Sequence, residues 1–246
     1  MSKPYRTSIT THEDGRIYVY GQDLLKLAGE RSFTAAIYLI LKGEMPDENS
    51  EKMLDALLTV SLDHGVEPPS VVAARNVYSG GSPIQAAVAA GVLTFGEYHG
   101  GAIEASMETL KKYQPLGVKQ LVDDFSKSGL RISGFGHRLY SVDPRTQRLL
   151  EIAKELGFLG KYVKFALSLE EELSKGVKKL PLNIDGIWAA LLLEMGFNPK
   201  VGKGFFIIAR TPGLVAHVVE EALREKPFRR LSEKDVEYDG PRPRKS

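Results

Sequence analysis

The stretch SFTAAIYLILKG, residues 32–43, decides the fold class of this chain. Ser32 is a typical N-cap, the residues after it are apolar on nearly every side, and Gly43 and Pro46 end the run. A run of this length that is apolar all round is typical of a buried helix. We therefore predict a buried helix over residues 33–42.

Most of the remaining chain has the same helical character. Residues 49–63 have the spacing of an amphipathic helix, and similar patterns recur along the chain. They predict helices over residues 71–78, 84–92, 102–113, 146–156, 163–175, 184–195, 205–210 and 211–223. The exceptions are a strand or hairpin arm at 16–21, a loop or strand at 130–136 and a flexible basic tail at 239–246. The sequence thus predicts an all-α fold whose loops carry the functional residues.

The composition excludes several classes of function. Among the 246 residues there are 33 Lys and Arg against 31 Asp and Glu, and there is no Cys. Disulfides, thiolate metal sites and a Cys nucleophile are therefore excluded, and the net charge of +2 is too small for a nucleic-acid-binding surface. Because no apolar stretch reaches membrane-spanning length and no secretory signal is recognisable, we expect a cytoplasmic protein that binds neither membrane nor nucleic acid.

Three histidines lie beside glycines at loop or helix boundaries: His64, His99 and His137. An imidazole at such a place can exchange a proton near neutral pH while a ligand approaches the backbone. Each histidine taken alone is more typical of an ordinary loop residue. The spacing of the histidines predicts no metal site, and the GxG of residues 134–136 lacks the third glycine of a dinucleotide fingerprint.

Asp185 and Arg210 are the charged residues of two apolar stretches. Asp185 begins the helix predicted over residues 184–195, so it is either an N-cap or a desolvated acid whose raised pKa makes it a usable base. Arg210 closes the run GFFIIA and needs an anionic partner if it is buried. With Arg138 and Arg145 near His137, these residues suggest a site for a multiply anionic ligand that contains a carbonyl group.

Five segments, in this order, resemble the citrate synthase superfamily over nearly the whole chain. They are GQDLLKLAGERSFTAAIYLILKGEMP (21–46), HGGAIEA (99–105), GFGHRLYSVDPR (134–145), NIDG (183–186) and GFFIIARTPGLVAHVVEE (204–221). The resemblance implies an all-α fold with a large helical domain and a smaller domain that closes over coenzyme A (CoA). The implied limits are residues 1–104 for the first part of the large domain, 105–195 for the small domain, and 196–246 for the return to the large domain and the tail.

Within the superfamily, the chain is shorter than ordinary citrate synthases, and LDHG (62–65) departs from their pattern. The segments GVLTFGEYHGGAIEA (91–105), LPLNIDG (180–186) and PFRR (227–230) resemble the citryl-CoA-cleaving C-terminal module of ATP-citrate lyase. This resemblance implies a stand-alone citryl-CoA lyase, which splits citryl-CoA into acetyl-CoA and oxaloacetate without metal or a permanently bound cofactor. A separate citryl-CoA synthetase would be a possible partner. Two alternatives stay open: a citrate synthase, which also hydrolyses the thioester, and a non-catalytic protein that binds CoA or a di-acid.

The resemblance also implies roles for individual residues. His99 would stabilise the acetyl-CoA enol, Asp185 would exchange its methyl proton, and His137 would serve the oxygen on C3. His64, Arg145 and Arg210 would bind the carboxylates of oxaloacetate. A C-terminal residue, Arg229 or else Arg230 or Lys226, would reach the site of a neighbouring subunit, which implies a homo-oligomer. The residues implied to bind CoA are Ile132, Ser133, Gly134, Phe135, Gly136 and Arg138.

Overall fold

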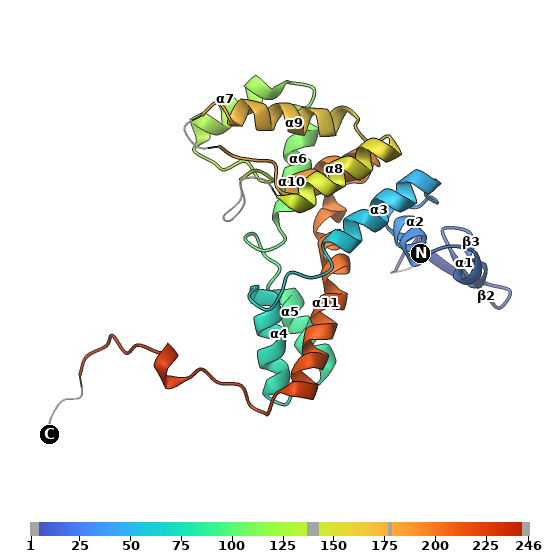
Figure 1. The fold of residues 1–246 in the computed structure, drawn as a ribbon. Coiled ribbons are helices and arrows are strands. Elements are labelled where there is room, and N and C mark those ends of the chain that lie inside the picture. The colour runs from blue at the N-terminus through green and yellow to red at the C-terminus, as the bar shows by residue number, and fades with distance from the viewer. Residues whose placement is uncertain (1–4, 137–142, 177–178, 243–246) are drawn as a thin grey trace. The chain divides into compact units, whose positions relative to one another are not determined.

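The computed structural model describes residues 5–136, 143–176 and 179–242 (Figure 1). In these residues the fold is mainly helical, as the sequence predicts. The α-helices are α1 (Leu24–Glu30), α2 (Phe33–Lys42), α3 (Glu48–Val60), α4 (Pro69–Ser79), α5 (Ile84–Leu93), α6 (Ala102–Tyr113), α7 (Val118–Ser128), α8 (Pro144–Leu156), α9 (Lys161–Leu173), α10 (Ile184–Glu194) and α11 (Gly202–Arg224). Two short 3₁₀ helices follow α10 and α11: η1 (Pro199–Val201) and η2 (Glu233–Asp235).

The chain forms two compact units, each built from two segments. The first contains Met1–Asp63 and Phe95–Arg210, and the second contains His64–Thr94 and Thr211–Ser246. The predicted domains, with limits after residues 104 and 195, are defined by how the small domain would close over CoA. The two compact units do not test such a closure, so these limits stay a prediction.

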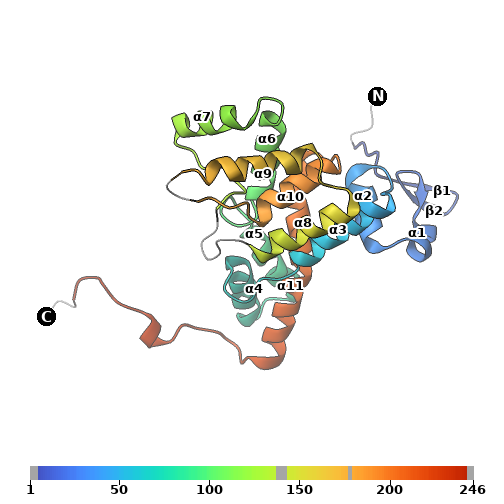
Figure 2. The same cartoon turned by 45° about the horizontal axis from the view of Figure 1, so that its top comes forward.

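Helix α10 is the centre of the first unit. Every residue from Gly186 to Leu193 is buried, as expected for a helix that is apolar all round. α10 packs against α6, α8 and α9, while α3 and α8 lie side by side (Figure 2). The indole of Trp188 is 1% exposed, and its Nε1 donates to Ser61 Oγ at 3.1 Å. Its single polar atom is thereby satisfied within the core.

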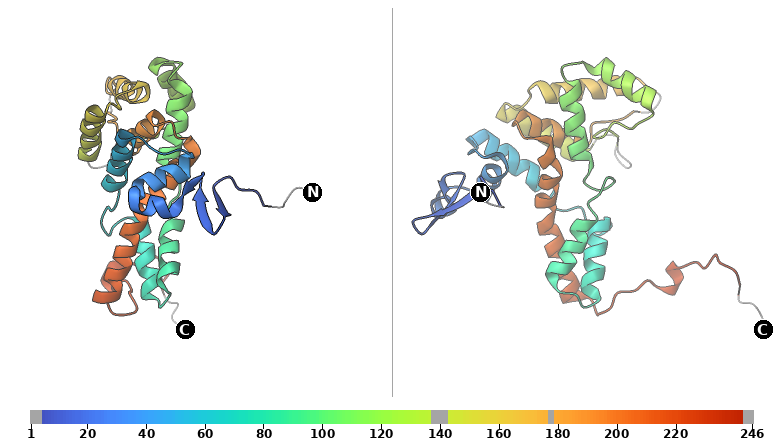
Figure 3. Two further views of the ribbon diagram at one scale, coloured as in Figure 1. Left: turned by 90° about the vertical axis from the view of Figure 1, so that its right-hand side faces the viewer. Right: turned by 180° about the vertical axis from the view of Figure 1, so that it is seen from behind.

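The small sheet before α1 has three antiparallel strands: β1 (Thr10–Glu13), β2 (Arg16–Val19) and β3 (Gln22–Asp23) (Figure 3). The strand predicted at 16–21 is β2, whose register pairs Thr10 with Val19. Helices α1 and α7 are absent from the sequence-based expectation. α1 buries no residue, so it lacks the apolar face that identifies a helix from sequence. α7 does carry apolar residues at helical spacing, Val118, Leu121, Val122 and Phe125, and sequence reasoning missed it.

The second unit contains α4, α5 and the C-terminal part of α11, which lie side by side (Figures 1 and 3). The prediction of separate helices at 205–210 and 211–223 is wrong, because α11 continues through Pro212. An internal proline costs about 3 kcal/mol of helix stability. Buried side chains on both sides of it, Phe205 and Leu214 among them, offset that cost by packing.

Candidate active site

Asp185 is the second residue of α10, and Asn183 is the N-cap of this helix. The side-chain Oδ1 of Asn183 accepts hydrogen bonds from Asp185 N at 3.0 Å and Gly186 N at 3.2 Å. The interpretation of Asp185 as an N-cap is therefore wrong. Its carboxylate is not needed to begin the helix, so it is left for another role.

Burial raises the pKa of Asp185 to about 6, from an ordinary value of 3.8. The positive charge of Arg145 acts against this rise, the negative charge of Asp143 adds to it, and Arg210 opposes it. The desolvation that the apolar sequence around Asp185 predicts is thus confirmed. A carboxyl group that titrates near 6 is well matched to proton transfer at neutral pH.

Arg145 is held at the start of α8 by Asp143. The carboxylate of Asp143, 1% exposed, caps the helix by accepting from Arg145 N at 3.0 Å. It also accepts hydrogen bonds from Arg145 Nε at 3.1 Å and Nη2 at 2.8 Å, which makes a bidentate ion pair with one edge of the guanidinium group. Sequence reasoning missed Asp143, although an Asp directly before a proline at the first helical position is an N-cap signal.

Arg210 lies on α11 and is only 4% exposed. Its Cζ stands 5.3 Å from the centre of the Phe206 ring, and among the described residues its Nε and Nη1 have no hydrogen-bond partner. Burial lowers the pKa of Arg210, while the charges of Asp63 and Asp185 raise it. Leaving a buried donor unpaired costs about 1–3 kcal/mol. The arrangement suits an anionic ligand that would satisfy these two donors.

His99 shares an aromatic cluster with Phe95 and Phe206. The imidazole centre lies 5.2 Å from the Phe95 ring and 5.8 Å from the Phe206 ring, both edge to face. The next residue, Gly100, has φ +81°, and a Cβ there would overlap the Phe206 ring. Because Phe206 contacts both His99 and Arg210, it brings these two predicted site residues into one region.

The loop at residues 133–136 is fastened to the segment that begins α10. Gly136 N donates to Pro181 O at 2.7 Å, and Asn183 N donates to Gly134 O at 3.0 Å. Gly134, with φ +89°, approaches Gly186 so closely that a Cβ on either glycine would overlap the other's backbone. These contacts bring the GFG and NIDG motifs together, beside Asp185.

The same loop borders two cavities of the first unit. One, of ≈1140 Å³, lies toward α6 and is lined by Ile132, Ser133, Gly134, Phe135 and Asn183, among others. The other, of ≈630 Å³, lies toward α7 and includes Ile132, Phe135 and Gly136. Five of the residues predicted to bind CoA therefore line cavities.

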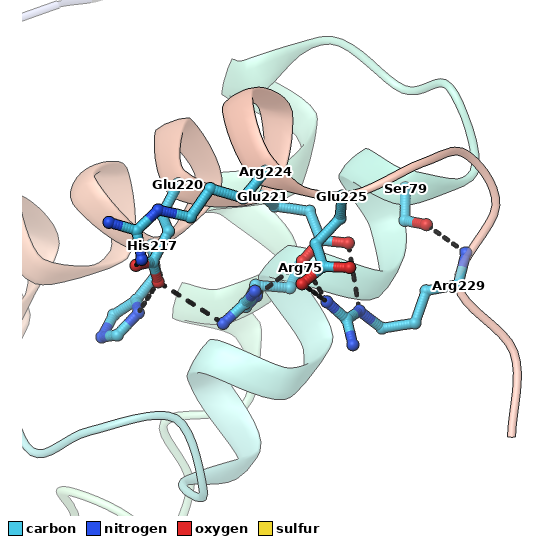
Figure 4. Close-up of polar contacts among 8 residues, drawn as sticks. All are labelled: Arg75, Ser79, His217, Glu220, Glu221, Arg224, Glu225 and Arg229. Atoms are coloured by element: carbon cyan, nitrogen blue, oxygen red, sulfur yellow. Dashed lines mark hydrogen bonds and ion pairs between the residues drawn. The ribbon is translucent and has the colours of Figure 1, made fainter.

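The remaining predicted site residues are either outside the described residues or part of the second unit. His137 and Arg138 are outside the described residues, so their roles stay predictions. His64 and Arg229 belong to the second unit. There Arg229 donates from Nε to Glu221 Oε1 at 3.0 Å and from Nη2 to Glu221 Oε2 at 2.7 Å, while Arg75 Nε donates to the same carboxylate at 2.7 Å (Figure 4).

Two further kinds of site are absent from the described ranges. Within residues 5–136, 143–176 and 179–242, no group of three or more His, Asp or Glu side chains could hold a metal ion. In the same ranges, no helix has the length and apolar character needed to cross a bilayer.

Comparisons with known proteins place these residues in a family. Residues 16–231 match the family described as "Citrate synthase, C-terminal domain". The structure of citryl-CoA lyase from Hydrogenobacter thermophilus is 48% identical with a TM-score of 0.94, and the match covers 99% of this chain and 98% of that one. ATP citrate lyase from Methanosaeta concilii shares the fold, with a TM-score of 0.86 at 22% identity over 98% of this chain and 42% of that one.

Among curated sequences, citrate synthase from Heyndrickxia coagulans is 32% identical over 204 residues, which are 80% of this chain and 54% of that protein. The chain spans about half the length of the citrate synthases it matches. Since the family match extends over most of its residues, the chain belongs to the citrate synthase family.

Proposed function

We propose that this chain is a citryl-CoA lyase, which cleaves citryl-CoA to acetyl-CoA and oxaloacetate. One observation carries the proposal: the match to the Hydrogenobacter thermophilus citryl-CoA lyase extends over 98% or more of both chains at 48% identity. The geometry supports it, since an acid with a pKa of about 6, an imidazole and two arginines lie in one unit.

In the proposed reaction, the C3 hydroxyl of the citryl group loses its proton to a base, the role expected of His137. The bond between C3 and the thioester methylene breaks, C3 becomes the ketone of oxaloacetate, and the electron pair passes to the acetyl-CoA enolate. His99 would donate a hydrogen bond to the thioester oxygen, where the negative charge collects. Asp185 in its protonated form would then deliver a proton to the methylene carbon, which completes acetyl-CoA.

The carboxylates of the oxaloacetate half would be bound by arginines. Within the part of the chain that the structure describes, Arg210 has two buried donors without a hydrogen-bond partner, and Asp143 accepts hydrogen bonds from Nε and Nη2 of Arg145. A dicarboxylate at these groups would form charge-assisted hydrogen bonds. His64 would join them, and a second subunit would add Arg229 or else Arg230 or Lys226, so the active species would be a homo-oligomer.

CoA would bind along residues 132–136 and Arg138, with the thioester directed toward Asp185. The cavities that border this loop support the placement. Closure of the small domain, residues 105–195, over CoA would exclude water from the enolate. The thioester would be a substrate and no group would stay bound between turnovers. A separate cytoplasmic citryl-CoA synthetase would supply the substrate.

The second candidate is a citrate synthase, and the identity to curated citrate synthases favours it. Both enzymes form the same enolate, but a synthase also hydrolyses the thioester of citryl-CoA. The difference therefore appears in the fate of the thioester.

The test is a pair of steady-state assays in buffer that contains EDTA. A lyase given citryl-CoA releases oxaloacetate, which malate dehydrogenase and NADH detect, and it releases no thiol. A synthase given acetyl-CoA and oxaloacetate releases one thiol for each citrate formed. Thiol release at the rate of turnover would replace the proposal with the synthase. Loss of activity in EDTA that one divalent ion restores would contradict the metal-free mechanism.

A further inference from the structure

Asn183 makes polar contacts in two directions. Its Oδ1 accepts from the backbone N–H groups of Asp185 and Gly186, as the N-cap of α10. Its Nδ2 donates to the carbonyl oxygen of Gly136 at 2.8 Å, across 47 residues of sequence. One side chain thus connects the turn that carries Asp185 to the loop at residues 133–136.

We propose that Asn183 is a positioning residue, which keeps the Asp185 carboxylate in register with the loop that is proposed to bind CoA. The inference rests on the proposed function, because it assigns the loop to CoA and Asp185 to the methyl group. A base that acts on the methyl of a thioester needs its oxygen in line with one C–H bond. An error of about 1 Å in such an alignment lowers a rate by about 10²-fold.

The amide is the group that this position requires. It supplies an acceptor toward α10 and a donor toward Gly136 at the same time, whereas a serine hydroxyl is shorter and an aspartate has no donor. Serine and aspartate are nevertheless N-caps as good as asparagine. Substitution by either therefore separates the two roles, because the cap is kept while the bond to Gly136 is lost.

Two backbone hydrogen bonds hold the loop independently of the side chain: Gly136 N to Pro181 O and Asn183 N to Gly134 O. Removal of the amide is therefore expected to misalign the loop by a small amount without releasing it. Affinity for CoA should stay within about threefold of wild type, while the chemical step slows. A slower chemical step with nearly unchanged CoA affinity indicates a positioning residue, since the loss of a residue that only stabilises the fold would not separate these two quantities.

The experiment compares wild type, Asn183→Ser and the matched control Asn198→Ser. Asn198 is the N-cap of η1, and its Oδ1 accepts from Lys200 N at 3.0 Å. Exchange of the acetyl-CoA methyl protons into deuterated water is followed by NMR with L-malate, a dicarboxylate without the ketone. CoA affinity is measured by calorimetry and melting temperature by calorimetric scanning.

We expect Asn183→Ser to exchange about 10²-fold more slowly than wild type, with nearly unchanged melting temperature and CoA affinity. Asn198→Ser should match wild type in all three. If Asn183→Ser exchanges at the wild-type rate, Asn183 is only a cap. Should that variant fail to fold, Asn183→Asp, measured on the high-pH plateau of its own exchange profile, must show the same loss.

This test separates the inference from the proposed function, because methyl exchange is common to lyase and synthase. A wild type that exchanges protons but does not cleave citryl-CoA refutes the lyase and leaves the role of Asn183 to the comparison of variants. A wild type without any exchange overturns both, because there would be no carbon proton transfer for Asn183 to align.

Discussion

The Asp185 carboxyl is desolvated in the first turn of α10, and this raises its pKa to about 6. Arg210 is also removed from water, and two of its buried donors lack a partner among the described residues. Both residues are costly to the fold on their own. Such unfavourable burial is typical of functional sites. There a bound ligand can accept the hydrogen bonds of the buried donors, and a proton can neutralise the buried carboxylate.

Asp185→Asn should abolish proton exchange at the methyl group of acetyl-CoA. An amide has no basic oxygen, and general bases contribute about 10²–10⁴-fold to such steps. Because Asn183 caps the helix, the substitution leaves the cap intact and the variant should bind CoA normally. In wild type the exchange rate should rise with pH through about 6 as the carboxylate forms in the field of Arg145, Asp143 and Arg210. Wild-type exchange in the variant would remove Asp185 from the mechanism.

The same variant makes a prediction about stability. The pKa of Asp185 is higher in the folded chain than in the unfolded chain, so ionisation costs folding free energy, and the cost grows as the pH rises from about 4 to about 6. The difference between 3.8 and about 6 corresponds to about 3 kcal/mol at most. Asp185→Asn should therefore unfold at higher urea concentration than wild type at pH 8, and at nearly the same concentration at pH 3. A variant that is less stable at pH 8 would show that the carboxylate is structural.

Arg210→Gln should weaken oxaloacetate binding by about 2–4 kcal/mol, because the buried carboxylate loses a charged partner. Affinity for acetyl-CoA should change little. Arg224→Gln is the matched control, since Arg224 lies on the same helix with its side chain 74% exposed. Calorimetry that finds equal oxaloacetate affinity in both variants would make Arg210 a structural residue.

At the scale of elements, the site is made where α8 and α10 begin and where the 133–136 loop meets α10. The sequence predicts α10, α6 and most other helices, because their apolar residues recur with helical spacing. It does not predict that Asn183, rather than Asp185, caps α10, since both residue types are good caps. Nor can it predict that Gly134 rests on Gly186, because such contacts depend on the tertiary structure.

Gly100→Ala tests the element that carries His99. Gly157 provides the matched control, because it has φ +83° and open space where a Cβ would stand, whereas Gly100 has φ +81° and faces Phe206. A side chain at such a φ costs about 1–3 kcal/mol, so Gly157→Ala should lose only that. Gly100→Ala should lose more stability and at least tenfold in turnover, because Phe206 and His99 must move. Equal effects in urea unfolding and in turnover would show that the contact with Phe206 does not position the histidine.

At the scale of the whole molecule, the all-α fold and the family follow from sequence, because five motifs stand in one order. The division into two units does not, since each unit is built from two segments distant in the chain. The motifs also do not distinguish a lyase from a synthase, because the roles proposed for Asp185, His99 and the arginines would be the same in both reactions. They differ in whether a water molecule reaches the thioester.

That difference is measured most directly in a single turnover. The wild-type chain, in excess over citryl-CoA, is quenched at intervals, and acetyl-CoA, free CoA, oxaloacetate and citrate are separated by chromatography. The proposed lyase gives acetyl-CoA and oxaloacetate in equal amounts, with no free CoA above the enzyme-free control. Free CoA and citrate formed in equal amounts at the rate of substrate loss would contradict it and identify the chain as a synthase.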